Sequence, residues 1–259
     1  MQNVDVVAIL DRAAMNKNHM ILVFWCSLIM LFDGYDMVIY GSLLPHLMND
    51  WQLTPQKAGL LGSASLIGMM VGAATLTMAA DKFGRKKIIL TCTSLFSVAV
   101  IFNIFASDPI SFFICRFFTG VGLGGAVPIM VTMIKEMAPS MHRNKLINFM
   151  LAFYGLGAIL SGLAGLFLIP VFGWESVFVL AGVSILVIPL LNKTFPESVS
   201  FLIQKDRQEE VVDSLKQLNP THLHQPDMMC AEKIGGLNLV NYTYSSGVYH
   251  EQKTSELYN

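Results

Sequence analysis

The feature that most constrains this chain is a series of six long apolar runs separated by short connections. Each run has close to the ~20 residues that a helix needs to cross ~30 Å of hydrocarbon. Inside lipid every backbone N–H and C=O group must be satisfied within its own segment, so each run is predicted to be a helix. The runs cover residues 20–44, 58–80, 88–107, 110–134, 146–169 and 176–191.

Composition agrees with a membrane protein and argues against several function classes. Hydrophobic residues make up 54% of the 259 residues and charged residues only 14%, whereas soluble domains are about 25% charged. A net charge of −1 with no basic stripe argues against nucleic-acid binding. The four cysteines and six histidines show neither metal-ligand spacing nor a hydrolase arrangement. We therefore expect no enzyme activity, no cofactor and no metal.

The distribution of cations predicts the orientation. Lys and Arg concentrate before the first run, in the second and fourth connections and after the sixth run, while the other connections hold only Lys57. By the positive-inside rule, both ends of the chain are predicted to be cytoplasmic, in a cell (inner) membrane. The expected domains are a cytoplasmic N-terminus at 1–19, a six-helix membrane domain at 20–192, a cytoplasmic amphipathic helix at 193–220 and a poorly ordered tail at 221–259.

Three charged residues interrupt the apolar runs. Asp33 and Asp36 are one helical turn apart in the first run, and Arg116 lies in the fourth at a similar predicted depth. A charge costs at least about 2.5–3.5 kcal/mol in the middle of a membrane, so such residues commonly mark a substrate or proton pathway. Burial would let a carboxyl group take up and release a proton near neutral pH. A purely structural Asp36–Arg116 ion pair is the alternative.

Glycines mark two further features. Asp81, Gly84 and Arg85 form a short loop between the second and third runs, where an acid, a tight turn and a cation suggest contacts that can form and break. In the fourth run, glycines are predicted to allow close helix packing, although their spacing formally matches a dinucleotide-binding motif. These glycines are Gly120, Gly122, Gly124 and Gly125. The glycine-rich fifth run is also predicted to pack closely.

Three motifs resemble the major facilitator superfamily: DKFGRKK after the second run, RFFTGVGLGGAVP in the fourth and PES after the sixth. The sequence DGYD, from Asp33 to Asp36, resembles that of the aromatic acid:H⁺ symporter family, and the residues that flank it resemble its benzoate transporters most closely. The resemblance covers about residues 18–203. It implies an all-α polytopic membrane fold whose six transmembrane helices correspond to the N-terminal half of a twelve-helix transporter.

The resemblance also implies roles for individual residues. Asp33, Tyr35 and Asp36 would serve substrate and proton transport, and Arg116 would be the fourth-helix arginine linked to proton coupling. The loop residues Asp81, Gly84 and Arg85 would form the cytoplasmic gate motif. Two positions depart from the family pattern, namely Thr77 where the gate motif usually begins with glycine, and the stretch from Lys135 to Pro139 after the fourth run.

The expected function is therefore proton-coupled symport of an aromatic carboxylate such as benzoate across the cytoplasmic membrane. The partners would be the carboxylate, a proton and the lipid bilayer, together with a homodimer or a second half-transporter chain that supplies the missing half. Two alternatives stay open. The chain could be a truncated, non-transporting half-transporter or interaction fragment, or it could belong to a symporter of another small organic anion.

Overall fold

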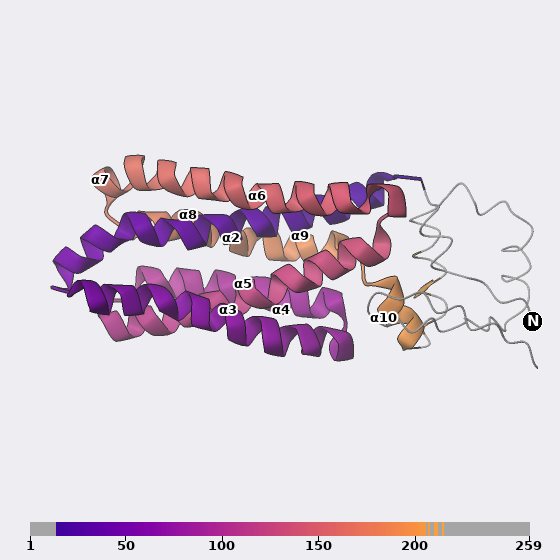
Figure 1. The fold of residues 1–259 in the computed structure, drawn as a ribbon, viewed down its shortest axis with the longest axis horizontal. Helices are drawn as coiled ribbons and strands as arrows, with labels where there is room; N and C mark the ends of the chain where they lie inside the picture. The colour runs from indigo at the N-terminus through magenta and orange to yellow at the C-terminus, as the bar shows by residue number, and fades with distance from the viewer. Residues whose placement is uncertain (1–13, 206, 208–209, 212–213, 215–259) are drawn as a thin grey trace, which may run out of the picture.

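The computed structural model describes residues 14–205, 207, 210–211 and 214. Five long helices run side by side along the molecule, and three shorter consecutive segments complete a sixth rod (Figure 1). The long helices are α2 (Lys17–Asp50), α3 (Pro55–Phe83), α4 (Arg85–Ile104), α5 (Pro109–Met137) and α6 (Ser140–Phe167). The sixth rod consists of α8 (Ser176–Gly182), the 3₁₀ helix η1 (Val183–Leu186) and α9 (Val187–Thr194). Short helices α7 (Ile169–Phe172) and α10 (Val199–Gln204) lie near opposite ends of the bundle.

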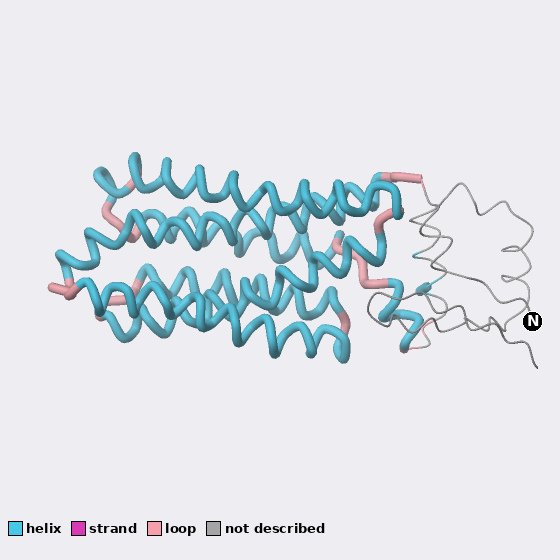
Figure 2. Tube along the Cα trace, viewed as in Figure 1, coloured by secondary structure: helices cyan, strands magenta, loops and turns pink. Residues whose placement is uncertain are grey.

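All six predicted apolar runs are helical in the described residues, where six helical segments are long and apolar enough to cross a membrane. The connections between them are short loops (Figure 2). The turns after α3 and α5 and the first residue of α2 lie at the same end of the bundle, which carries Lys17, Arg85 and Lys145 and is called the basic end below. Of the predicted amphipathic helix at 193–220, residues 206, 208–209, 212–213 and 215–220 lie outside the described residues, as does the whole tail at 221–259.

Local sequence explains where three of the five long helices begin. Asn16 caps α2, because its side chain accepts hydrogen bonds from the backbone N–H groups of Asn18 and His19. Thr54 and Asp108 cap α3 and α5 in the same way, and each is followed by a proline at the first helical position. These polar residues satisfy backbone donors that would otherwise have no partner at the helix ends.

The end of the first helix differs from the sequence prediction. The first apolar run was expected to end at Leu44, before a proline, but α2 continues to Asp50 with Pro45 inside it. A proline removes one hydrogen bond and crowds the carbonyl group four residues earlier, which here belongs to Gly41. Membrane helices commonly tolerate such a proline. As a result Asp36 lies fourteen residues before the end of α2, about 21 Å along the helix axis.

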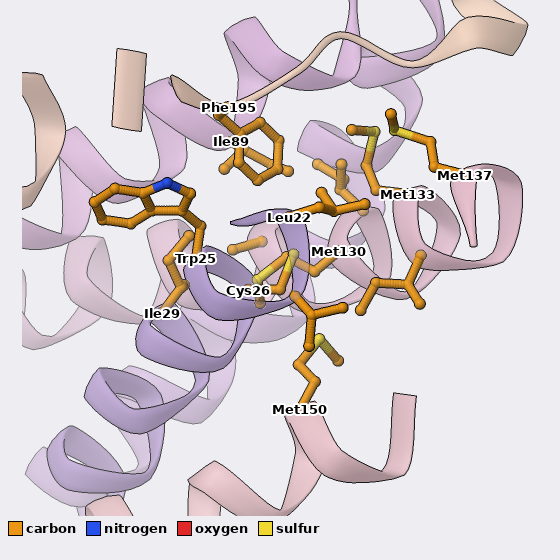
Figure 3. Close-up of a cluster of buried hydrophobic side chains, with 14 of the residues drawn as sticks. Leu22, Trp25, Cys26, Ile29, Ile89, Met130, Met133, Met137, Met150 and Phe195 are labelled. Carbon is orange, nitrogen blue, oxygen red and sulfur yellow. The ribbon is translucent and has the colours of Figure 1, made fainter. Parts of the chain in front are cut away.

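Two apolar clusters fill the interior. The cluster at the basic end contains Leu22 and Cys26 of α2, Ile89 of α4 and the methionines of α5 (Figure 3). The second cluster, toward the other end, includes Tyr35, Ile39, Phe96, Phe112 and Trp174. Along α2, the first cluster ends at Met30 and the second begins at Tyr35, so Asp33 falls between them.

Candidate functional site

The centre of the bundle holds a buried ion pair. Arg116 of α5 donates from Nη1 to Oδ1 of Asp36 on α2, at 2.7 Å, and Nη2 lies 3.4 Å from the carbonyl oxygen of Asp36. The side chains are 2% and 0% exposed, respectively. Oδ2 of Asp36 and Nε of Arg116 have no hydrogen-bond partner among the described residues. The pair is thus shielded from water yet keeps unused hydrogen-bonding capacity.

Asp33 lies in a different environment, although it is only one turn away from Asp36. Its side chain is buried, its Oδ1 has no hydrogen-bond partner and it forms no ion pair within the described part of the chain. Gly34 presses against the backbone of Tyr154, which brings α2 and α6 together next to Asp33. The two carboxyl groups predicted as one site therefore differ, since only Asp36 is held by a cation.

Two tyrosines of α2 lie close to the pair. Tyr35, which was predicted for the pathway, donates its hydroxyl to the carbonyl oxygen of Val177 on α8, at 2.9 Å. Tyr40 was not singled out from the sequence. Its ring faces the guanidinium of Arg116, with Cζ 5.6 Å from the ring centroid. The helical spacing of Asp36 and Tyr40, four residues apart, is the signal that could have identified it.

A second polar network surrounds Arg85 at the basic end. Arg85 Nη2 lies 2.8 Å from Oε1 of Glu136 and 3.3 Å from Oδ1 of Asp81, and Nη1 donates to Ser198 Oγ at 2.9 Å. Ser198 also donates to Glu136. Asp81 is 68% exposed, whereas Glu136 is 18% exposed. The predicted gate residues Asp81 and Arg85 thus meet, but Glu136 is the closer and more buried partner of the arginine.

Gly84 makes the sharp turn that the sequence predicted. It adopts φ of +104° between α3 and α4, a region that disfavours residues with a side chain. The carboxylate of Glu197 accepts a hydrogen bond from the backbone N–H of Lys86, in the first turn of α4, at 3.0 Å. An anion is favoured at that position because backbone N–H groups point toward it. Glu197 lies in the PES motif and Glu136 in the stretch that departs from the family pattern, but the sequence assigned neither a role, because their partners are far away along the chain.

The glycines of α5 lie where helices touch backbone to backbone. A side chain at Gly120 or Gly124 would collide with the backbone of α3, and one at Gly122 with the backbone of α4. Gly125 packs against Leu76 and Cys92. The prediction for the fifth run was wrong in part, because a side chain at Gly155 or Gly162 of α6 would meet open space. Glycines that face open space cannot be told from packing glycines by spacing alone.

The residues at the centre of the bundle are suited to binding charged groups. No group of three or more potential metal ligands occurs in the described ranges. The central residues instead offer a fixed cation, one paired carboxyl group and one unpaired carboxyl group in an apolar bundle. Such a set can bind an organic anion or a proton, provided that the buried charges stay balanced.

Comparison with known proteins gives consistent matches. The profile of the Major Facilitator Superfamily matches residues 26–227. The chain is 34% identical to the benzoate transport protein of Acinetobacter baylyi over 231 residues, which cover 87% of this chain and 50% of that protein. It is 33% identical to the niacin transporter NiaP of the same organism, covering 83% of this chain and 49% of that protein. It is 35% identical to the gallate transporter of Pseudomonas putida, covering 77% and 44%.

Solved structures share the fold. The proton:xylose symporter XylE, bound to 6-bromo-6-deoxy-D-glucose, superposes with a TM-score of 0.72 at 22% sequence identity. That match covers 84% of this chain and 55% of the symporter. The chain also spans about half the length of the curated relatives that it matches.

Proposed function

Because the chain belongs to the major facilitator superfamily, we propose that it forms the N-terminal half of a transporter that moves an aromatic carboxylate together with a proton. The buried Asp36–Arg116 pair is the observation that carries this proposal. The curated relatives are transporters rather than enzymes, and those named for benzoate, gallate and niacin have substrates that are aromatic rings with a carboxylate. The predicted family and fold class are confirmed.

Charge balance explains how the pair couples two substrates. With Asp36 ionised, its charge and that of Arg116 cancel. If Asp36 takes up a proton, Arg116 is left with an uncompensated positive charge, and a carboxylate ligand restores neutrality. Binding of either the proton or the anion alone leaves a net buried charge, which costs several kcal/mol. Anion and proton therefore bind together, and their joint movement carries no net charge.

Asp33 supplies a second position for a proton in this scheme. It is buried without a cation, so it is most stable in its neutral, protonated form. Its position one turn from Asp36 allows a proton to pass between the two carboxyl groups through a water molecule or a substrate. Tyr35 fixes this part of α2 against α8 through its hydrogen bond to Val177.

The orientation completes the proposal. The basic end of the bundle faces the cytoplasm by the positive-inside rule, in an inner membrane, and Arg85 with its partners forms the gate on that side. In this fold a substrate lies between two six-helix units near the midplane of the membrane. The transport cycle accordingly requires a second such unit, whether from the same chain, a second copy or another chain.

Uptake of radiolabelled benzoate into cells that express the full chain tests the proposal. We expect benzoate uptake that is abolished by a protonophore and by Asp36→Asn. Unlabelled gallate and niacin serve as competitors for the labelled benzoate. Lys57→Gln, which changes an exposed charge outside the central pair, is the matched control and should leave uptake unchanged. No uptake above the empty-vector level, despite correct membrane insertion, would favour the alternative of a non-transporting half.

The identity of the anion is tested separately. If benzoate fails, the same cells are offered a panel of small carboxylates of equal charge, both aromatic and aliphatic. Uptake of an aliphatic acid that still depends on Asp36 and Arg116 would retain the charge-balance mechanism and overturn the aromatic substrate class. Uptake that persists in Asp36→Asn would overturn the mechanism itself.

A further inference from the structure

Arg116 is held on two sides by groups of different chemistry. Its edge, at Nη1, faces the carboxylate of Asp36 at 2.7 Å. Its guanidinium also lies over the ring of Tyr40, with Cζ 5.6 Å from the centroid. A cation is attracted to the face of an aromatic ring within about 6 Å, and more strongly when both are away from water. The ring is uncharged, so protonation of Asp36 does not remove this contact.

Tyr40 is itself fixed by a third helix. Its hydroxyl donates to the carbonyl oxygen of Ala58 on α3, at 2.5 Å. Its ring lies against Gly62, one turn further along α3, where an added side chain would collide with it. The ring also approaches that of Phe112, with centroids 6.5 Å apart. The ring therefore has little freedom to turn away from Arg116.

We propose that Tyr40 is a positioning residue, which keeps the Arg116 guanidinium at the centre of the bundle while Asp36 is neutral. This inference rests on the proposed function for its biological meaning. When Asp36 takes a proton, Arg116 loses its ionic partner and would otherwise be free to swing toward water. The ring of Tyr40 retains it, so that the cation stays where an arriving carboxylate can bind.

If Tyr40 has this role, removal of its ring should lower the stability of the natural chain and of the Asp36→Asn variant by different amounts. In the natural chain, Asp36 holds Arg116 as well, so loss of the ring is partly compensated. In Asp36→Asn, which mimics the protonated carboxyl group, the guanidinium loses its ionic partner and keeps neutral ones, namely the ring of Tyr40 and the carbonyl oxygen of residue 36. Tyr40→Leu should therefore destabilise the Asp36→Asn protein more than the natural one.

Thermal unfolding of the purified full chain in detergent, followed by tryptophan fluorescence, measures this difference. We expect Tyr40→Leu to lower the unfolding midpoint by a further amount on the order of 3 °C in the Asp36→Asn background. Tyr40→Phe keeps the ring and should remove most of this additional drop. Phe195→Leu is the matched control, because its buried ring lies in the cluster at the basic end and its loss should cost the same in both backgrounds.

A second background guards against failure of Asp36→Asn to fold. The double variant Asp36→Asn/Arg116→Met lacks both charges of the central pair, so Tyr40→Leu should there cost only the packing of the ring and its hydrogen bond to Ala58. Equal drops in the natural, Asp36→Asn and double-variant backgrounds would overturn the proposal. These measurements need neither a substrate nor a second unit, so a negative uptake result would leave them standing.

Uptake kinetics add a readout that loss of packing would not change. Where benzoate uptake is observed, Tyr40→Leu should raise the half-saturating concentration roughly tenfold. Tyr40→Phe should stay near the natural value, and neither change should alter the amount of protein in the membrane. An unchanged half-saturating concentration in Tyr40→Leu would contradict the positioning role.

Discussion

Removal of one member of the central ion pair is the sharpest test of the charge-balance argument. Asp36 and Arg116 are almost completely buried and 2.7 Å apart. Loss of either partner leaves an uncompensated buried charge, which typically costs about 3–5 kcal/mol. For a chain of this size, each kcal/mol lowers the unfolding midpoint by about 2–4 °C. Arg116→Met and Asp36→Asn should therefore each lower it by roughly 6–20 °C.

The double variant should recover most of this loss. Asp36→Asn with Arg116→Met removes both charges together, and replacement of a buried pair by neutral side chains is often close to neutral. We expect the double variant to lie within about 1 kcal/mol of the natural chain, so that the two single costs are far from additive. The assay is reversible unfolding in mixed detergent micelles, followed by the fluorescence of Trp25, Trp51 and Trp174.

The pH dependence of the two single variants should differ. In Arg116→Met, the unpaired Asp36 carboxyl escapes its buried charge by taking up a proton, so the loss of stability shrinks as pH falls. In Asp36→Asn, the guanidinium cannot lose its proton, so the stability of this variant does not recover at this site as pH falls. Two outcomes would refute the view that this pair is shielded from water. One is that each single variant costs less than about 1 kcal/mol and the two costs add up in the double variant; the other is that the two single variants have identical pH profiles.

Three further changes test the packing and the network at the basic end. Glu136→Gln should destabilise the chain more than Asp81→Asn, because Glu136 is less exposed and closer to Arg85; equal losses in thermal unfolding would contradict that ranking. Gly124→Ala should cost about 1–3 kcal/mol by forcing α3 and α5 apart, whereas Gly155→Ala, which meets open space, should cost nothing measurable in the same assay. His19→Ala should cost about 1–3 kcal/mol, because the buried ring contacts the Met137 carbonyl oxygen at 3.0 Å; an unfolding midpoint equal to that of the natural chain would show this contact to be unimportant.

The features that the sequence predicted are those set by local chemistry. Apolar run length locates the helices, and Gly84 with Arg85 locates a turn, because each depends on residues that are neighbours along the chain. The ion pair between Asp36 and Arg116 was also predicted, as the structural alternative to a transport role, because few positions can balance a charge inside lipid. The pair alone does not distinguish a structural role from transport, and the uptake experiments address that choice.

Features that depend on tertiary contact were missed. The end of α2 was misplaced because a proline usually marks a helix boundary, whereas the bundle here extends the helix through Pro45. Glu136 was noted only as a departure from a family pattern, and its place beside Arg85 depends on how α5 crosses the end of α3. Tyr40 was not distinguished from the other aromatic residues of α2, because its contact with Arg116 depends on how α2 packs against α5.

Helices α3 and α5 contribute to both polar networks, the one around Arg116 and the one around Arg85. This limits how a change in one network can affect the other. Helix α5 carries both Arg116 and Glu136, twenty residues or about 30 Å apart along its axis. Helix α3 meets both networks as well, through Ala58 beneath Tyr40 and through Asp81 beside Arg85. Backbone contacts at the glycines leave little room for α3 and α5 to slide on each other. We therefore expect a change at Arg116 to reach Arg85 by movement of the α3–α5 pair as one body against α2 and α6.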